Sequence, residues 1–336
     1  MCCMKKIVEL PFGEPLLTTY HRHITVGICL YGNPTLINWY LNKVANISCN
    51  SRFLSGFTTP SMDIENAIFH DCSYLHKWWY PMRFAKGHIN AIIRELIDDG
   101  YYVYFQGVDD YYLENKSFYK KQHFEHDGMI VGYDQENKTY SVYAYDERWV
   151  CRKFKISQKS FNQGWLALFK KGIYGNIFGI KPKKEKIEFN PREALCAIQE
   201  YLDSSMEKYP PTSEGMIYGI AVQEYLAMYL SKLLDGSIPY ERMDRRVLRL
   251  LWEHKRLMKM RIQKIEEIFS LDSEISTQYD LLEKEADRLR MLYATYSMKK
   301  RDALLMTIRT RLIQLNNKER KLLEQLIEKT KGVIEL

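Results

Sequence analysis

The distribution of helix-breaking residues constrains this chain more than any other feature. All ten prolines lie between Pro11 and Pro239, and the only glycine after that point is Gly332. Proline and glycine are the residues that most disfavour a helix interior, so almost a hundred residues nearly free of them predict long helices. We therefore expect an irregular first part and a helical last part.

Apolar residues in the last part recur at spacings of three and four, as they do on one face of a helix. Three such runs are present, at residues 247–269, 279–293 and 305–315. They predict three amphipathic helices, with turns near residues 271–274 and near either 296–302 or 315–319. Apolar stripes need partners, so we expect an antiparallel bundle, completed by a helix within residues 215–236.

The first 180 residues have a different composition. The segments YYVYFQ, GMIVGYD and TYSVYAYD are rich in aromatic and β-branched residues and are separated by turns, which is typical of strands. Asn33 and Pro34 stand at the positions preferred for an N-cap and a first helical residue, so a helix is expected there. A second helix is expected before Gly100. This half is therefore predicted to be an α+β domain with antiparallel strands.

Bulk properties indicate a folded cytoplasmic protein. The chain has 336 residues, of which 46% are hydrophobic. No run approaches the roughly 18 uncharged apolar residues of a membrane span, and the first residues lack the apolar block of a secretion signal. The seven cysteines are odd in number and widely spread, which indicates free thiols in a reducing compartment. We expect no membrane association.

The net charge is +7, and most of the excess lies in the helical part. From residue 241 to the end there are 22 Lys and Arg against 16 Asp and Glu. This surplus fits either a footprint for an acidic partner, such as a carrier protein or a nucleic acid, or an ordinary solvated helix face. The two signs are interleaved, which favours the second interpretation, and no nucleic-acid motif is present.

The segment HFEHDGMIVGYDQENKTYSVYAYD predicts a β-hairpin that carries a site. Its turn centre lies near Glu136, so residues whose numbers sum to about 272 face one another, and His126 and Asp146 meet this condition. An imidazole beside a carboxylate is how thiol enzymes hold their base in one tautomer, while a cysteine at a helix N-terminus supplies the nucleophile. Cys29, which precedes the helix expected at Asn33, is the candidate nucleophile.

These features resemble the butirosin biosynthesis protein H N-terminal family, papain-like domains related to bacteriocin-leader peptidases and found in antibiotic and nonribosomal-peptide gene clusters. The resemblance rests on residues 99–146, which include the "YY" segment and the hairpin, and on RRVLRLLWEHKRLMKMRI in the helical part. It implies a papain-like (cysteine-peptidase-like) fold and thiol-dependent acyl transfer from a carrier protein to an amine. In that mechanism a thiolate attacks a carrier-bound thioester, and His126 moves the protons.

The chain departs from this pattern at the start of the first helix. Alignment of LYGNPTLINWYL with the family places Tyr31 and Gly32 where its His-Cys pair lies, and Cys29 stands three residues upstream. Two functions therefore remain open. The chain is either an accessory acyltransferase for a small-molecule or peptide amine, or a catalytically inactive papain-like protein that binds a carrier protein or a peptide intermediate. A leader peptidase is a third reading, with weaker support in the cysteine pattern.

Four further residues are candidates for substrate binding. Trp79 belongs to an aromatic cluster that can line a groove for a peptide or a ring-bearing substrate, or anchor a core. Asp109 and Asp110, beside Tyr111 and Tyr112, can orient an amine substrate or support the histidine strand. Histidines 21, 23, 70 and 76 and Cys72 carry metal-capable atoms, but no set with matching spacing completes a site, so we expect no metal and no cofactor.

The expected architecture has two parts. Residues 1–185 form the papain-like α+β domain, and residues 186–336 form an all-α helical domain, with a lysine-rich linker between them. The sequence does not predict the oligomeric state.

Overall fold

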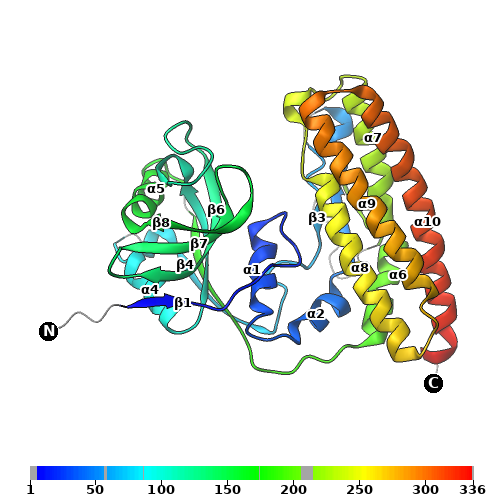
Figure 1. The fold of residues 1–336 in the computed structure, drawn as a ribbon, viewed down its shortest axis with the longest axis horizontal. Helices are drawn as coiled ribbons and strands as arrows, with labels where there is room; N and C mark the ends of the chain where they lie inside the picture. Colours follow the sequence, from blue (N-terminus) through cyan, green and yellow to red (C-terminus); the bar gives the residue numbers. More distant parts are fainter. Residues whose placement is uncertain (1–5, 57–58, 86, 174, 206–214, 335–336) are drawn as a thin grey trace. The chain divides into compact units, whose positions relative to one another are not determined.

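The computed structural model describes residues 6–334 except 57–58, 86, 174 and 206–214, and it divides the chain into two compact units (Figure 1). Unit 1 comprises the residues up to Leu36 together with Ile68–Lys186, and unit 2 comprises Ile37–Ala67 together with the residues from Ile187 on. The protein is of the α+β class, as predicted. Within the described ranges, no helix combines the length and the apolarity needed to cross a bilayer.

Unit 1 is built on a seven-stranded sheet in which neighbouring strands are antiparallel. The strand order is β4-β9-β5-β6-β7-β8, and β1 pairs with part of β6. The strands are β1 (Ile7–Glu9), β4 (Leu75–Pro81), β5 (Tyr102–Asp109), β6 (Glu125–Asp134), β7 (Thr139–Tyr145), β8 (Cys151–Ser157) and β9 (Asn176–Pro182).

The predicted hairpin is present as β6 and β7. Met129 lies opposite Tyr143 and Ile130 lies opposite Val142, so the expected register is confirmed in this part of the hairpin. An irregularity between Ile130 and Gly132 shifts the register by one toward the turn.

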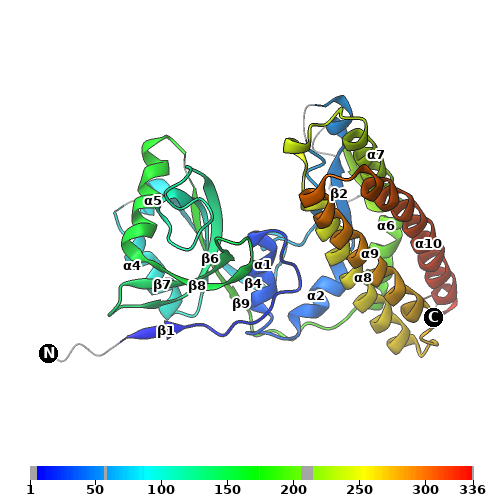
Figure 2. The same cartoon turned by 45° about the horizontal axis from the view of Figure 1, so that its top comes forward.

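Four helices belong to unit 1, namely α1 (His21–Cys29), α3 (Met82–Ala85), α4 (Ile89–Asp98) and α5 (Gln158–Lys170). Side chains of α4 and α5 pack with Val103, Phe105 and Ile130 in a buried cluster on one face of the sheet. Figures 1 and 2 both show α1 on the opposite face from α5. The helix predicted before Gly100 is confirmed as α4, and Gly100 follows it with a φ of 80°. The sequence did not predict α1.

Unit 2 contains the long helices. Figures 1 and 2 show α8, α9 and α10 side by side, with α7 along α10. The helices of this unit are α2 (Leu36–Lys43), α6 (Pro191–Leu202), α7 (Val222–Leu234), α8 (Val247–Phe269), α9 (Glu274–Lys299) and α10 (Asp302–Ile334). The three predicted amphipathic helices and the turn near 271–274 are confirmed. The second turn lies near residue 300, so the alternative at 315–319, inside α10, is wrong.

Residues 37–67 belong to unit 2, which corrects both the predicted boundaries and the all-α expectation for the second half. This segment carries β2 (Ile47–Asn50) and β3 (Asp63–Ile64), and β2 also pairs with β10 (Met216–Tyr218), giving a small three-stranded sheet. The buried Arg261 of α8 donates to the carbonyl oxygens of Tyr40, Leu41 and Val44 at the end of α2. The Tyr40 carbonyl also accepts from the amide of Val44, whereas the Leu41 and Val44 carbonyls are among those that the helix end leaves without a backbone donor.

A buried polar cluster joins five helices of unit 2, namely α6, α7, α8, α9 and α10. The carboxylate of Glu319 in α10 accepts hydrogen bonds from Lys255 Nζ at 2.5 and 2.7 Å, from Gln223 Nε2 at 2.6 Å and from the hydroxyls of Tyr201 and Tyr279. A buried ion pair is tolerated when its remaining polar atoms are also bonded, and the hydrogen bonds of Lys255 and Glu319 meet this condition, although Gln223 Oε1 has no partner among the described residues.

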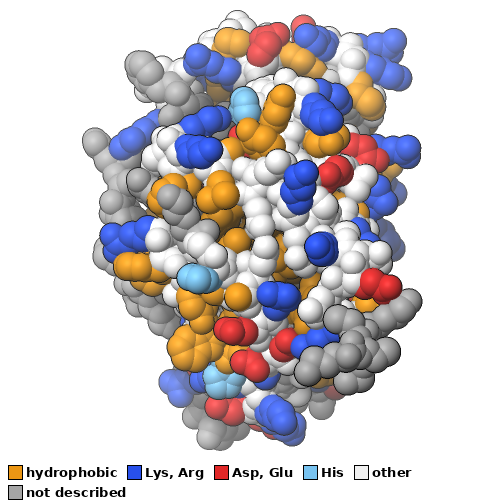
Figure 3. Space-filling model, turned by 90° about the vertical axis from the view of Figure 1, so that its left-hand side faces the viewer, with side chains coloured by type: hydrophobic (Ala, Val, Ile, Leu, Met, Phe, Trp, Pro, Cys, Tyr) orange, Lys and Arg blue, Asp and Glu red, His pale blue; other side chains and the backbone are white. Residues whose placement is uncertain are grey.

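The surface shows no segregation of charge on the face drawn in Figure 3, where basic side chains lie among acidic and hydrophobic ones. This mixture is typical of an ordinary solvated surface.

Candidate functional site

The predicted partner of His126 is not Asp146. Asp146 accepts hydrogen bonds from the backbone amides of Arg148 and Val150 and pairs with the guanidinium of Arg152, so it stabilises the turn between β7 and β8. These contacts lower the pKa of its carboxyl group, which burial alone would raise. The prediction that Asp146 orients His126 is therefore wrong, although the register that suggested it is present nearby in the hairpin.

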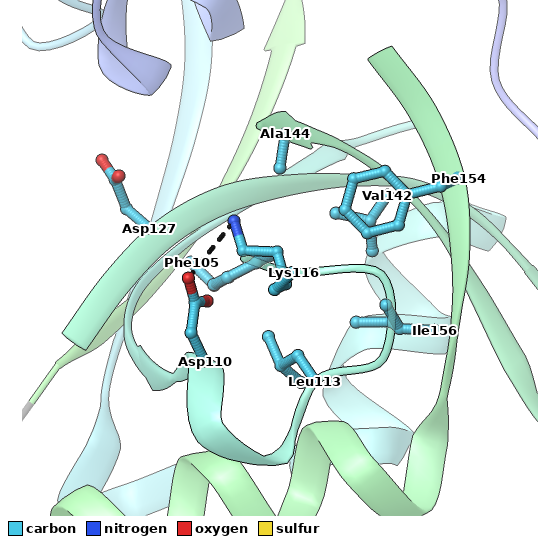
Figure 4. Close-up of a pocket in the computed structure, with 9 residues that line it drawn as sticks. All are labelled: Phe105, Asp110, Leu113, Lys116, Asp127, Val142, Ala144, Phe154 and Ile156. Atoms are coloured by element: carbon cyan, nitrogen blue, oxygen red, sulfur yellow. Dashed lines mark ion pairs between the residues drawn. The ribbon is translucent and has the colours of Figure 1, made fainter. Parts of the chain in front are cut away.

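The carboxylate beside His126 comes from Asp110, in the short 3-10 helix that follows β5. His126 Nδ1 lies 3.0 Å from Asp110 Oδ2 and 3.0 Å from Lys116 Nζ. Lys116 Nζ also donates to the Tyr145 carbonyl oxygen at 2.8 Å, and its pKa is lowered by burial despite the attraction of Asp110. Figure 4 shows Asp110 and Lys116 pointing toward one another in a packed cluster, with Asp127 pointing away from them.

The surroundings of Cys29 do not activate its thiol. It occupies the last turn of α1, is fully buried, and has a pKa raised by burial and further by Cys72. A helix C-terminus carries a partial negative charge, which opposes thiolate formation, whereas a helix N-terminus would favour it. At 1.5 Å per residue, Cys29 lies about 12 Å along the axis from the first residue of α1.

The first residue of α1 is His21, and it meets the sheet directly. His21 Nδ1 lies 2.8 Å from Asp127 Oδ1, and the Tyr104 hydroxyl donates to Asp127 Oδ2 at 2.7 Å. His21 Nε2 is buried and has no hydrogen-bond partner among the described residues. The His21 ring packs edge-on against that of His126, with centroids 5.2 Å apart.

The electrostatics of this second pair favour a neutral imidazole. Burial lowers the pKa of His21, and Asp127 offsets only part of this effect. Burial would raise the pKa of Asp127, but His21 and Tyr104 hold it well below its ordinary value. The pKa of Tyr104 is raised by burial and by Asp127. At neutral pH Asp127 is thus a carboxylate that holds the Nδ1 proton of a neutral His21, leaving the Nε2 lone pair as a base.

Three of these side chains could also hold a metal ion. His21, His126 and Asp127 each offer a ligand atom, and these atoms lie within 4.8 Å of one another. Two histidines and one carboxylate are a common ligand set for divalent metals. However, both oxygens of Asp127 already accept hydrogen bonds, and Lys116 adjoins His126. The arrangement therefore suits proton transfer better than metal binding.

Asp109, Tyr111 and Tyr112 form a separate cluster around a third histidine. The fully buried Asp109 accepts a hydrogen bond from His123 Nδ1 at 2.7 Å and two weaker ones from the amides of Tyr111 and Phe124. The Tyr111 ring stacks on His123 with centroids 4.4 Å apart, and Tyr112 meets Tyr111 edge-on. Asp109 thus fixes the loop between β5 and β6 and has no oxygen exposed to a substrate.

Trp79 lies in edge strand β4 and lines an open pocket of about 540 Å³. Its side chain is 62% exposed, and its Nε1 donates to Asn176 Oδ1 at 2.8 Å. The other lining residues are His70, Lys77, Trp78, Gln106, Asn176 and Phe178. Of the four predicted substrate-binding residues, Trp79 is the one that faces a pocket of this size.

The sequence analysis named His126, and it named Asp110 as a residue that can support the histidine strand, which the structure confirms. Asp127 directly follows His126, so its proximity was readable from the sequence. The contacts that recruit His21 and Lys116 were not, because His21 is 106 residues from Asp127 along the chain.

Comparison with protein-family models and with curated proteins finds no match to this chain.

Proposed function

We propose that unit 1 is a papain-like domain that acts in natural-product tailoring and transfers an acyl group from a carrier-bound thioester to an amine. Two features support the fold assignment. The N-terminus of α1 meets His126 of an antiparallel sheet, which is the arrangement that the resemblance to the butirosin family implies. The second feature is that the first helix begins at His21 rather than near Tyr31 and Gly32, so that under this assignment a histidine stands at the helix N-terminus where the family has a cysteine.

The base in this proposal is His21, and no enzyme thiol takes part. The single observation that carries it is the His21–Asp127 pair with its unpartnered Nε2. A carboxylate on Nδ1 fixes the tautomer and stabilises the imidazolium that forms when Nε2 accepts a proton. The neutral state favoured by burial of His21 keeps this base available at neutral pH.

The reaction needs one proton relay. The amine nitrogen of the acceptor attacks the thioester carbonyl carbon, and His21 Nε2 takes the proton that the nitrogen releases. When the C–S bond breaks, His21 returns this proton to the departing carrier thiolate. The products are an amide and a free carrier thiol, and no acyl-enzyme forms. Since Nε2 is buried, the substrate must displace neighbouring side chains before transfer.

The buried position of Cys29 favours a second candidate function. A papain-like domain without an accessible thiol at its site can serve as a binding protein for a carrier protein or a peptide intermediate. In that case the histidine and carboxylate pairs would be structural, and the protein would bind its partner without turnover.

The two functions are separated by an acyl-transfer assay. Wild-type protein is incubated with acyl N-acetylcysteamine thioesters and hydroxylamine, and thiol release is followed. Replacing a general base typically costs 10²–10⁴-fold, so His21→Gln is expected to slow turnover by about 100-fold, while Cys29→Ala leaves it unchanged. His123→Gln, which removes a half-exposed histidine of another carboxylate pair, is the matched control.

Two results would overturn the proposal. Loss of turnover in folded Cys29→Ala would restore a thiol mechanism. Absence of turnover in the wild type, with carrier-protein binding retained, would establish the binding protein instead.

A further inference from the structure

The pocket beside Trp79 has the features of a built binding site. It lies at the sheet edge where β4 pairs with β9, and its volume of about 540 Å³ falls within the range of small-molecule sites. Trp79 lies opposite Phe178, and Phe178 lies opposite Tyr104 of β5. These three side chains therefore share one face of the sheet, the face that also carries Asp127.

Three of the seven lining residues are tryptophan or phenylalanine. The side chains of Trp78 and Trp79 are 55% and 62% exposed, although tryptophan is among the most hydrophobic of large side chains. The Phe178 ring contacts the ring of His70 with centroids 5.4 Å apart. Flat aromatic faces open to solvent are suited to stacking against a planar ring.

The polar groups of the pocket are mainly donors. Lys77 Nζ donates two of its three hydrogens to the carbonyl oxygens of His70 and Cys72, each at 3.1 Å. Asn176 and Gln106 each carry an amide NH₂ group. None of the described residues that line the pocket has a carboxylate. The pocket is therefore electrostatically matched to an anion and mismatched to an amine.

A directed chain of hydrogen bonds fixes these amides. Trp79 Nε1 donates to Asn176 Oδ1, and Asn176 Nδ2 donates to Gln106 Oε1 at 3.0 Å. The Gln106 side chain in turn bonds the Tyr104 hydroxyl, which donates to Asp127. Because each group donates to the next, each amide presents its remaining N–H in a defined orientation.

We propose that this pocket binds a planar ring that carries a carboxylate, with the ring stacked on Trp79 and the carboxylate bonded to Lys77 and the Asn176 amide. The proposal goes beyond the acyl-transfer function and does not depend on it. The hydrogen-bond chain links the occupied pocket to Asp127, so such a ligand would lie at one end of a continuous polar path to His21.

Calorimetric titration with three probes tests the proposal. The first, 2-naphthoate, has both ring and carboxylate; 2-naphthylmethylamine has the ring with the opposite charge; and acetate has the carboxylate alone. We expect 2-naphthoate to bind at least about tenfold more tightly than either of the others, the size expected from one charge-assisted hydrogen bond. Equal or tighter binding of the amine, or absence of naphthoate binding, would overturn the proposal.

Substitutions in the pocket locate the binding site without relying on the ranking of the three probes by affinity. Trp79→Ala and Lys77→Gln are each expected to weaken naphthoate binding at least about tenfold, and Lys77→Arg is expected to retain it within a fewfold. Trp149→Ala, which removes a 52% exposed tryptophan outside the pocket, is the matched control and should have no effect. An equal loss in Trp149→Ala would show that the ligand binds elsewhere. If the Lys77→Gln variant does not fold, the Trp79→Ala variant and the relative affinities of the three probes still test the proposal.

Discussion

At the scale of single residues, the decisive feature of this protein is which groups surround each histidine. His126 pairs with Asp110 and Lys116, His21 with Asp127, and His123 with Asp109. Three imidazoles at or beside the start of β6 thus have three different carboxylates. Their exposure differs, and only His21 combines a carboxylate on one nitrogen with a buried unpartnered second nitrogen among the described residues.

The cysteines give a direct test of the thiol-free site. Cys29 is fully buried with a raised pKa, whereas Cys196 is exposed. We expect iodoacetamide to label Cys196 in the native protein and to leave Cys29 unmodified until denaturant is added, because only an accessible thiolate reacts. Peptide mass spectrometry after labelling at a series of pH values measures both. Labelling of native Cys29 below pH 7 would contradict the buried, unactivated thiol.

Part of the site was predictable from the residues and part was not. The hairpin register follows from the alternation of side chains and the turn position, which are local properties. The partner of His126 depends on the irregular register between β5 and β6, where pairing shifts between Phe105 and Val108 and brings Asp110 alongside. No local pattern encodes such a shift. Asp146, which satisfied the register rule, instead had turn amides and Arg152 within reach.

At the scale of elements, α1 shows why one helix escaped prediction. Its sequence HRHITVGIC contains three consecutive β-branched residues, which lower helix propensity. Its N-cap, Tyr20, makes no side-chain capping bond, and no acidic residue lies in the first turn. Eight of its nine residues are buried, so tertiary packing stabilises a helix that carries no cap signal.

The long helices show the opposite case. Their apolar periodicity predicted all three, because packing in a bundle requires a stripe at that spacing. The ends lacked the usual glycine signal. Ser270 and Lys300, with φ of 50° and 48°, occupy the left-handed cap positions. Serine and lysine at such positions give no pattern that a reader of the sequence can use to place a helix end.

The attachment of α2 to α8 gives a prediction at this scale. Arg261 bonds three carbonyl oxygens at the end of α2, so Arg261→Met would leave buried acceptors without donors. An unpaired buried acceptor costs 1–3 kcal/mol, and we expect the free energy of unfolding to fall by about 3 kcal/mol. Urea denaturation followed by circular dichroism measures this loss. Arg309→Met, which replaces an exposed arginine of α10, should change little; an equal loss there would refute the assignment.

At the scale of the whole molecule, stability should depend on pH through buried neutral histidines. The pKa of His254 is held well below its ordinary 6.5 by burial and by the adjacent Lys255, and its Nε2 bonds the Ala45 carbonyl. The pKa of His21 is also lowered. Below about pH 6.5 the unfolded chain binds protons that the folded chain does not. Stability is therefore complete above this pH and is lost as the pH falls.

The expected slope is about 1.4 kcal/mol per pH unit for each such histidine. Urea denaturation at pH 7, 6 and 5 measures it, and His254→Gln should flatten the profile because glutamine can still donate to Ala45 without titrating. His88→Gln, at an exposed position, should leave the slope unchanged. A profile that is flat in the wild type would exclude burial of neutral histidines.

The chain passes between the two units at residues 36–37, 67–68 and 186–187, and this has a consequence for its synthesis. The carbonyl oxygens at the end of α2 have no side-chain donor until Arg261 has been synthesised, 220 residues after Leu41. At 5–20 residues per second, a ribosome needs roughly 10–45 s to cover this interval. All of unit 1 emerges within that time, while residues 37–67 lack their helical partners. In the nascent chain, residues 37–67 therefore expose apolar side chains after all of unit 1 has been synthesised. We expect a ribosome-associated chaperone to bind this segment.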